Sequence, residues 1–178
     1  MKILAISGSL RTKSSNTAVL RAAARLAPPG VDIVLFDSIA RLPFFNPDQD
    51  GDQVPEAVAA FRTVIGTSDG ILISSPEYAR GVAGVMKNAL DWLVGSFEFP
   101  DKPVALINTS PRATHALAAM RLTLETISAR LVNDACVTLP LPGRENDETS
   151  IVSNNELAEP LRIAIGCFVD AIGVSREI

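Results

Sequence analysis

The sequence contains few of the residues that form disulfides or bind metals, with two cysteines and one histidine among 178 residues. Cys136 and Cys167 lie far apart and form no C-x-x-C pair, so we expect both to pack as small apolar side chains. His115 is followed one helical turn later by Ala119, which is not a metal ligand. A lone histidine cannot build a metal centre, and no metal site is expected.

Long apolar runs and clusters of one charge are also missing. No apolar run approaches the ~18 residues of a membrane span, and no signal peptide precedes the first predicted strand. We therefore expect a cytoplasmic protein with no membrane contact. The 16 basic and 20 acidic residues give a net charge of -4, and without a basic cluster nucleic acid is excluded as a partner.

The motifs of several enzyme classes are absent as well. There is no G-x-S-x-G elbow of a serine hydrolase and no G-x-G-x-x-G dinucleotide fingerprint. A P-loop would need glycines where Ser7 and Thr12 stand, so ATP chemistry is disfavoured. The first predicted strand also ends without the acidic pair of a phospho-receiver domain.

What the sequence does have is a high apolar content. Hydrophobic residues make up 47% of the chain and the mean hydropathy is +0.25. Large apolar surfaces usually mark association sites. This surplus predicts a buried subunit interface, in a homodimer or a homotetramer.

Short β-rich runs alternate with helical patterns five times along the chain. Their continuous apolar character is typical of strands buried on both faces of a parallel sheet. The predicted strands are Lys2–Ser7, Val31–Phe36, Gly70–Ser74, Pro103–Asn108 and Ala135–Leu139. We therefore predict an α/β fold, with residues 1–178 forming a single domain around a five-stranded, doubly wound parallel sheet with helices on both faces. Ligands of such sheets bind beyond the carboxyl ends of the strands.

Apolar residues at three- and four-residue spacing predict the helices. The clearest stripe runs from Leu117 to Leu131, so this helix is expected to reach Leu131. Pro111 directly after Ser110 predicts the first residue of that helix, with Ser110 as its N-cap. A last helix is predicted from Leu157 to Ile172.

Two polar loops, about Ser38–Gln53 and Pro140–Val152, are long for a compact domain, and we expect them to be functional. Phe44 and Phe45 are unusually apolar for the first of these loops. They either cover the edge of the sheet or reach into the active site of a partner subunit.

The loop after the first strand is rich in hydrogen-bond donors. The N–H groups at the start of a helix, with its positive dipole end, form an anion site. The side chains that add to this site are those of Ser9, Arg11, Ser14, Ser15, Asn16 and Thr17. So many donors suit a terminal phosphate monoester better than the pyrophosphate of a dinucleotide. The alternative is an ordinary polar loop that only caps its helix.

The loop after the third strand completes a family pattern. Residues 76–92 read PEYARGVAGVMKNALDW, and Gly8 to Asn16 fit the pattern G-S-L-R-x-x-S-x-N. Together these motifs resemble the NADPH-dependent FMN reductase family, which includes bacterial quinone, chromate and azo-dye reductases. The order of strands and helices matches over nearly the whole chain. The resemblance implies a flavodoxin-like fold with strand order 2-1-3-4-5.

The resemblance also implies roles for individual residues. The FMN phosphate would be held by Ser9, Arg11, Ser14, Asn16 and their neighbours Ser15 and Thr17. The isoalloxazine ring would be bordered by Pro76, Glu77, Tyr78 and Ala79, largely through backbone N–H groups at its polar edge, and Ser110 would contact the flavin. Arg112 and His115 are candidates for the nicotinamide and substrate pocket, and the alternative for each is a solvent-exposed role. Structural or interface roles are implied for Lys87, Asn88, Asp91 and Trp92.

The sequence departs from the family at three places. Ala79 stands where the family has an asparagine, so that side-chain contact is lost. Ala83 replaces the proline before Gly84. The loop after the fourth strand, usually glycine-rich, reads TSPRATH from Thr109 to His115.

The function implied by the resemblance is NAD(P)H-dependent reduction through FMN. NADPH or NADH would pass hydride to flavin N5, and a quinone-like or other small electrophilic acceptor would then take the electrons. Two alternatives are a flavodoxin-like electron carrier that docks on a protein partner and a flavin-free, nucleotide-binding regulatory protein on the same fold. No residue is identified as a catalytic acid or base.

Overall fold

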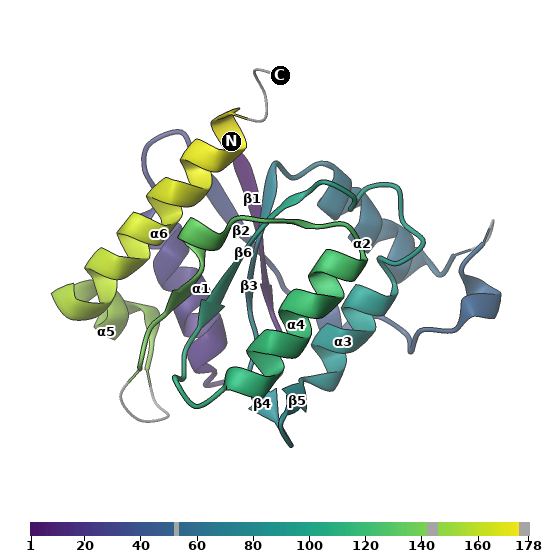
Figure 1. Ribbon diagram of the computed structural model, residues 1–178, viewed down its shortest axis with the longest axis horizontal. Coiled ribbons are helices and arrows are strands. Elements are labelled where there is room, and N and C mark those ends of the chain that lie inside the picture. Colours follow the sequence, from purple (N-terminus) through teal and green to yellow (C-terminus); the bar gives the residue numbers. More distant parts are fainter. Residues whose placement is uncertain (52–53, 142–145, 175–178) are drawn as a thin grey trace.

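The computed structural model describes residues 1–51, 54–141 and 146–174, and a mainly parallel sheet forms its centre (Figure 1). The strands of this sheet are β1 (Lys2–Ser7), β2 (Asp32–Phe36), β3 (Gly70–Ser74), β6 (Pro103–Asn108), β7 (Arg130–Leu131) and β8 (Val137–Thr138). The strand order is β2-β1-β3-β6-β7, with β8 also paired to β6. The first, third and fourth predicted strands are confirmed with their bounds, and the second begins one residue later than predicted.

The predicted fifth strand, Ala135–Leu139, is confirmed only at Val137–Thr138, which form β8, and a second short strand, β7, precedes it beside β6. β7 pairs with the first residues of β6, Pro103 and Val104, and β8 pairs with the last, Ile107 and Asn108. A 3-10 turn at Asn133–Ala135 separates them. Within the described residues the sheet therefore has six strands, and the chain beside β6 leaves the ladder and rejoins it.

Helices cover both faces of the sheet, as predicted (Figure 1). α1 (Ser15–Leu26), α5 (Glu148–Ser153) and α6 (Asn155–Val174) lie on one face, and α2 (Glu56–Gly66), α3 (Gly84–Asp91) and α4 (Thr114–Thr126) lie on the other. β1 shows why two cores form, because side chains alternate between the faces of a strand. Ile3 and Ala5 join the core under α1 and α6, whereas Leu4 and Ile6 join the core under α2, α3 and α4. In the part of the chain described, no helix is long and apolar enough to cross a membrane.

α4 is shorter at both ends than the sequence predicted. It begins at Thr114, because Ser110 and Pro111 form a separate turn in which the Ala113 N–H donates to the Ser110 carbonyl at 3.1 Å. It ends at Thr126, and Ser128, with a φ of 63°, takes the left-handed conformation that terminates many helices. Leu131 lies in β7 instead.

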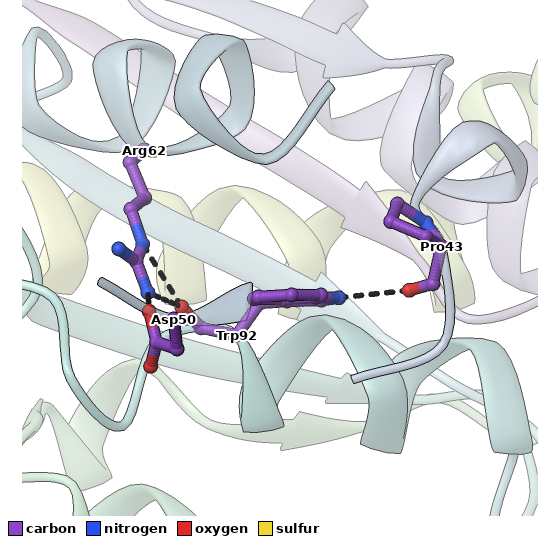
Figure 2. A network of polar contacts seen from close by, with 4 residues as sticks. All are labelled: Pro43, Asp50, Arg62 and Trp92. Atoms are coloured by element: carbon purple, nitrogen blue, oxygen red, sulfur yellow. Dashed lines mark hydrogen bonds and ion pairs between the residues drawn. The ribbon is translucent and has the colours of Figure 1, made fainter. Parts of the chain in front are cut away.

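The long loop after β2 is tied to α3 by the side chain of Trp92 (Figure 2). The Trp92 indole donates to the Pro43 carbonyl at 2.8 Å, and Asn88 Nδ2 donates to the same oxygen at 2.9 Å. Asn88 Oδ1 also accepts the Phe45 N–H at 2.8 Å. The Phe45 ring stands edge-on to Trp92, with the ring centroids 5.0 Å apart. Phe45 therefore covers α3, whereas Phe44 is 90% exposed.

The backbone of Trp92 holds the other end of this loop through Arg62 (Figure 2). Arg62 on α2 donates to the Trp92 carbonyl and pairs with Asp50 at 2.6 Å. Trp92 itself is fully buried within the single chain. Asn88 and Trp92 therefore have a structural role within the chain, rather than only a role at a subunit interface. The Trp92 ring is buried even in an isolated chain.

Candidate functional site

A cavity of about 670 Å³ lies where loops meet at the carboxyl ends of the strands, a volume within the usual range for a small-molecule site. Its lining comes from the loops after β1, β3, β6 and β8: Ser9, Arg11, Ser14, Ser15, Asn16, Pro76, Tyr78, Thr109, Ser110, Pro111, Arg112, Pro140 and Leu141. Two guanidinium groups and several hydroxyls belong to this set, and none of these described lining residues carries a carboxylate. The cavity is therefore suited to a ligand with an anionic group.

Asn16 holds three of these loops together. Its side-chain oxygen accepts the Ser74 hydroxyl at 2.9 Å and the Thr109 hydroxyl at 3.4 Å. Ser74 ends β3 and Thr109 follows β6, while Asn16 itself lies in the first turn of α1. Asn16 is only 7% exposed. This amide thus fixes the mutual positions of the loops that line the cavity.

Hydroxyl groups organise the loop before α1. Ser14 is the N-cap of α1, and its hydroxyl accepts the Thr17 N–H at 3.2 Å. The Thr17 hydroxyl in turn lies 2.8 Å from the Ser7 hydroxyl. Thr17 lines a neighbouring cavity of about 320 Å³ rather than the main one. Ser9, Arg11 and Ser15 line the main cavity directly, at the end of the helix where an anion is favoured.

Gly8 and Ser75 bring the first and third loops into close contact. The Gly8 N–H donates to the Ser74 carbonyl at 2.9 Å. A Cβ atom on Gly8 would lie 2.2 Å from the Ser75 hydroxyl, so only glycine fits. That hydroxyl is buried and has no hydrogen-bond partner among the described residues. The residue Ser75 also lines a cavity of about 270 Å³ that shares Pro76, Ser110 and other residues with the main one.

The PEY segment forms a small hairpin at the cavity. β4 (Glu77–Tyr78) pairs antiparallel with β5 (Gly81–Val82). The two residues of its loop, Ala79 and Arg80, have φ values of 49° and 58°. Two positive φ values are typical of two-residue hairpin turns, which favour Asn, Asp and Gly. Ala79 does not line the main cavity or the two smaller cavities described above, whereas Tyr78 lines the main one and is 52% exposed.

The loop after β6 is held by Asn108. Its side chain donates to the Ser110 carbonyl at 2.7 Å and accepts the Ser110 N–H at 3.2 Å. Ser110 and Arg112 line the main cavity. His115 is exposed on the first turn of α4 and does not line the main cavity or the two smaller cavities described above. Its role in the substrate pocket stays a prediction.

Glu77 uses its side chain differently from the other candidates. Glu77 lies between Pro76 and Tyr78, which line the main cavity, and it lines the smaller cavity of about 270 Å³ itself. Its carboxylate, however, accepts the N–H of Ala116 in α4 at 2.9 Å. The side chain therefore ties the hairpin to a helix.

Sequence reasoning missed four lining residues: Thr109, Pro111, Pro140 and Leu141. Thr109 and Pro111 flank the predicted Ser110. Pro140 and Leu141 begin the second long loop, and they follow β8, whose carboxyl end points to the same edge as the others. The signal that could have found them is the rule that parallel strands end at one edge of a sheet.

Comparison with known proteins identifies close relatives of this chain. Residues 1–141 match the sequence model of the NADPH-dependent FMN reductase family. An NAD(P)H-dependent FMN reductase of Pseudomonas aeruginosa is 44% identical over 112 residues, which span 62% of this chain and 60% of that protein. A 2-hydroxy-1,4-benzoquinone reductase of a Burkholderia species is 36% identical over 174 residues, 96% of this chain and 93% of that protein.

A solved structure supports the fold over nearly the full length. FerB from Paracoccus denitrificans, described as a flavoenzyme NAD(P)H:(acceptor) oxidoreductase, superposes with a TM-score of 0.77 and 29% identity. The match covers 97% of each chain. The predicted flavodoxin-like α/β fold is confirmed, apart from the divided strand beside β6.

Proposed function

This chain belongs to the NADPH-dependent FMN reductase family, and from that premise we propose that it transfers electrons from NAD(P)H through FMN to a quinone-like small molecule. It is an enzyme of the NAD(P)H-dependent FMN reductase type, and FMN and NAD(P)H are its cofactors. The observation that carries the proposal is that motif residues from separate loops line one cavity with two arginines. The quinone-like acceptor is suggested by the Burkholderia relative. We take residues 1–178 as a single FMN-binding domain.

The phosphate of FMN would be held at the start of α1. Ser9, Arg11, Ser14, Ser15 and Asn16 line the cavity there, and charge-assisted hydrogen bonds to a phosphate are stronger than neutral ones. Thr17 supports this end indirectly, because its N–H is bound by the Ser14 hydroxyl. A terminal phosphate suits this loop, so we propose FMN rather than FAD.

The ring of the flavin would lie against the hairpin and the loop after β6. The backbone N–H groups of Glu77, Tyr78 and Ala79, which follow Pro76, would face the polar edge of the ring. Ser110, in the loop after β6, would also contact the flavin. When bound, FMN would supply the redox chemistry between NAD(P)H and the acceptor, with N5 as the expected hydride-accepting atom. Backbone donors at the polar edge stabilise negative charge on the reduced ring without rearranging.

The remaining wall residues would serve the nicotinamide and the acceptor. Arg112 lines the main cavity and the cavity of about 270 Å³, and its guanidinium would attract the phosphates of NAD(P)H. The apolar side chains of Pro140 and Leu141 would limit water around the ring. In this scheme no side chain of the protein has to donate a proton to the acceptor. If one does, His115 is the side chain to test.

The proposal is tested by the visible spectrum of the purified protein, followed by addition of NADPH. We expect a bound flavin that denaturation releases as FMN, bleaching with NADPH and recovery of the colour when 1,4-benzoquinone is added. Release of FAD, or failure of the apoprotein to bind added FMN, would contradict the cofactor assignment. Flavin that binds but is not reduced by NADPH would favour an electron carrier, and a protein that binds no flavin would favour a regulatory role.

We also propose that the chain forms a homodimer or homotetramer. Phe44, Val94 and Phe97 are large apolar residues with exposures of 90%, 62% and 98% in the single chain. Exposed apolar groups of this size favour association. Light scattering at micromolar concentration should report a dimer or a larger assembly, and a monomer would refute the idea. The cytoplasmic location stays a prediction.

A further inference from the structure

α4 begins without a cap from its own sequence. Ala113 occupies the N-cap position and has no side-chain acceptor. The first turn that follows, Thr114-His115-Ala116, carries no carboxylate. The first N–H groups of a helix have no partner within the helix. Ser110, which could have capped the helix, instead accepts N–H groups within its own turn.

The missing cap is supplied from the hairpin, 39 residues earlier in the sequence. Glu77 Oε2 accepts the Ala116 N–H at 2.9 Å. Ala116 is the third residue of α4, and this is one of the two N–H groups that a capping side chain normally binds. Ala116 is 2% exposed, so without Glu77 its N–H would lie away from water. A carboxylate at this end of a helix also interacts favourably with the helix dipole.

The two groups joined by this bond belong to segments that also carry lining residues of the candidate site. Glu77 lies between Pro76 and Tyr78, which line the main cavity. Ala116 lies one turn beyond Arg112, which lines the same cavity together with Ser110. In Figure 1, β4 and β5 lie beside the start of α4. The carboxylate therefore joins the hairpin to the first turn of α4, which directly follows the Ser110–Arg112 turn.

We infer that Glu77 is a positioning residue, whose carboxylate fixes the start of α4 and the Ser110–Arg112 turn against the hairpin so that the nicotinamide and the acceptor meet a preformed pocket. This inference rests on the proposed function. A turn held in one arrangement loses less conformational freedom when a ligand binds. Removing the carboxylate should therefore weaken binding at this wall, while the phosphate end at α1 keeps its own contacts.

The test compares Glu77→Ala and Glu77→Gln with the wild type. Glutamine keeps an acceptor oxygen at the same reach, whereas alanine removes it. The matched control is Glu125→Ala, which deletes an exposed carboxylate near the other end of α4. Three quantities are measured: the hydrogen-exchange rate of the Ala116 amide in the apoprotein, the visible spectrum of bound FMN, and KM and kcat for NADPH and 1,4-benzoquinone.

For Glu77→Ala we expect Ala116 exchange at least tenfold faster, a shifted flavin spectrum, and KM raised about fivefold or more with a smaller change in kcat. Glu77→Gln should recover most of each effect, and Glu125→Ala should match the wild type. The inference would be overturned if the Ala116 amide exchanged in Glu77→Ala at the same rate as in the wild type. Faster exchange with wild-type KM and spectrum would also overturn it, because Glu77 would then only cap the helix. A wild type that binds no FMN refutes the proposed function, and with it the positioning role.

Discussion

Replacing Ala79 with asparagine should stabilise the protein, because Ala79 has a backbone conformation that suits asparagine better. Ala79 and Arg80 form the two-residue loop between β4 and β5, and both have positive φ, 49° and 58°. An L-residue with a Cβ pays roughly 1–2 kcal/mol in the left-handed region. Asparagine visits that region more readily because its short side chain can hydrogen-bond locally.

The expected gain is part of that cost. We expect Ala79→Asn to raise the free energy of unfolding by about 0.5–1 kcal/mol, since asparagine relieves the strain incompletely. For a protein of this size, that corresponds to roughly 1–4 °C in Tm. Ala79→Gly should gain less, because glycine removes the Cβ penalty but adds about 0.4–1 kcal/mol of unfolded-state entropy.

The assay is thermal and urea unfolding of the apoprotein, followed by FMN titration. The control is Ala59→Asn at an exposed position within α2, where asparagine should cost up to about 0.7 kcal/mol through helix propensity. A higher free energy of unfolding in Ala79→Asn and a lower one in Ala59→Asn would support the conformational argument. Loss of stability in Ala79→Asn would refute it. Tighter FMN binding by Ala79→Asn without added stability would instead indicate that the asparagine side chain contacts the flavin, as the family resemblance implies.

Three further outcomes follow from individual contacts. Arg11→Ala should weaken FMN binding by about 2–3 kcal/mol in a titration and leave the circular dichroism spectrum unchanged, because only charge-assisted bonds to the phosphate are lost. Gly8→Ala should lower the free energy of unfolding by about 1–3 kcal/mol, measured by thermal unfolding, because its Cβ would lie 2.2 Å from the Ser75 hydroxyl. Gly84→Ala is the control and should be neutral or stabilising, because a Cβ there meets nothing within 4 Å. The backbone N–H of Ser150 and other hydrogen bonds lower the pKa of Asp147, so its contribution to stability is complete above the unfolded-state pKa and is lost as pH falls through the folded one. The stability difference between wild type and Asp147→Ala should therefore shrink on acidification from about pH 5 to pH 2.

Most of the sheet could be predicted from the sequence, because its central strands are buried on both faces. β3 and β6 are buried at every residue and contain no polar side chain before their last residues, Ser74 and Asn108, and such runs have a clear pattern. The strand beside β6 could not be predicted in the same way. β7 and β8 have two residues each and pair with opposite ends of β6, so neither is long enough to show a period.

The end of α4 shows how an apolar pattern can outlast its helix. Ile127 and Leu131 continue the three- and four-residue spacing of the helix, yet the helix ends at Thr126. Both side chains still pack against the core under α2, α3 and α4. The pattern records burial against that core, whether the backbone is helical or extended. Only the left-handed Ser128 marks the change.

Much of the candidate site could be predicted because its residues fall in two continuous motifs. The loops after β1 and β3 place most of the predicted side chains around one cavity. Pro140 and Leu141 could not be found in this way, because they follow a two-residue strand without a motif of their own. The capping of α4 by Glu77 could not be predicted from the sequence either, because the hydrogen bond joins residues 39 positions apart.

The two departures from the family in this hairpin region have different physical consequences. Ala83, in place of proline, has a φ of -55° and is 1% exposed. A proline has φ near that value, so the replacement keeps the conformation that proline would impose. Ala79 instead has a positive φ that alanine disfavours. The hairpin holds it there because β4–β5 pairing and the Glu77 bond to α4 fix both of its strands. A motif position can thus be occupied by an unfavourable residue when neighbouring contacts determine the backbone, and the effect of the substitution is then expected in stability before it is expected in the chemistry.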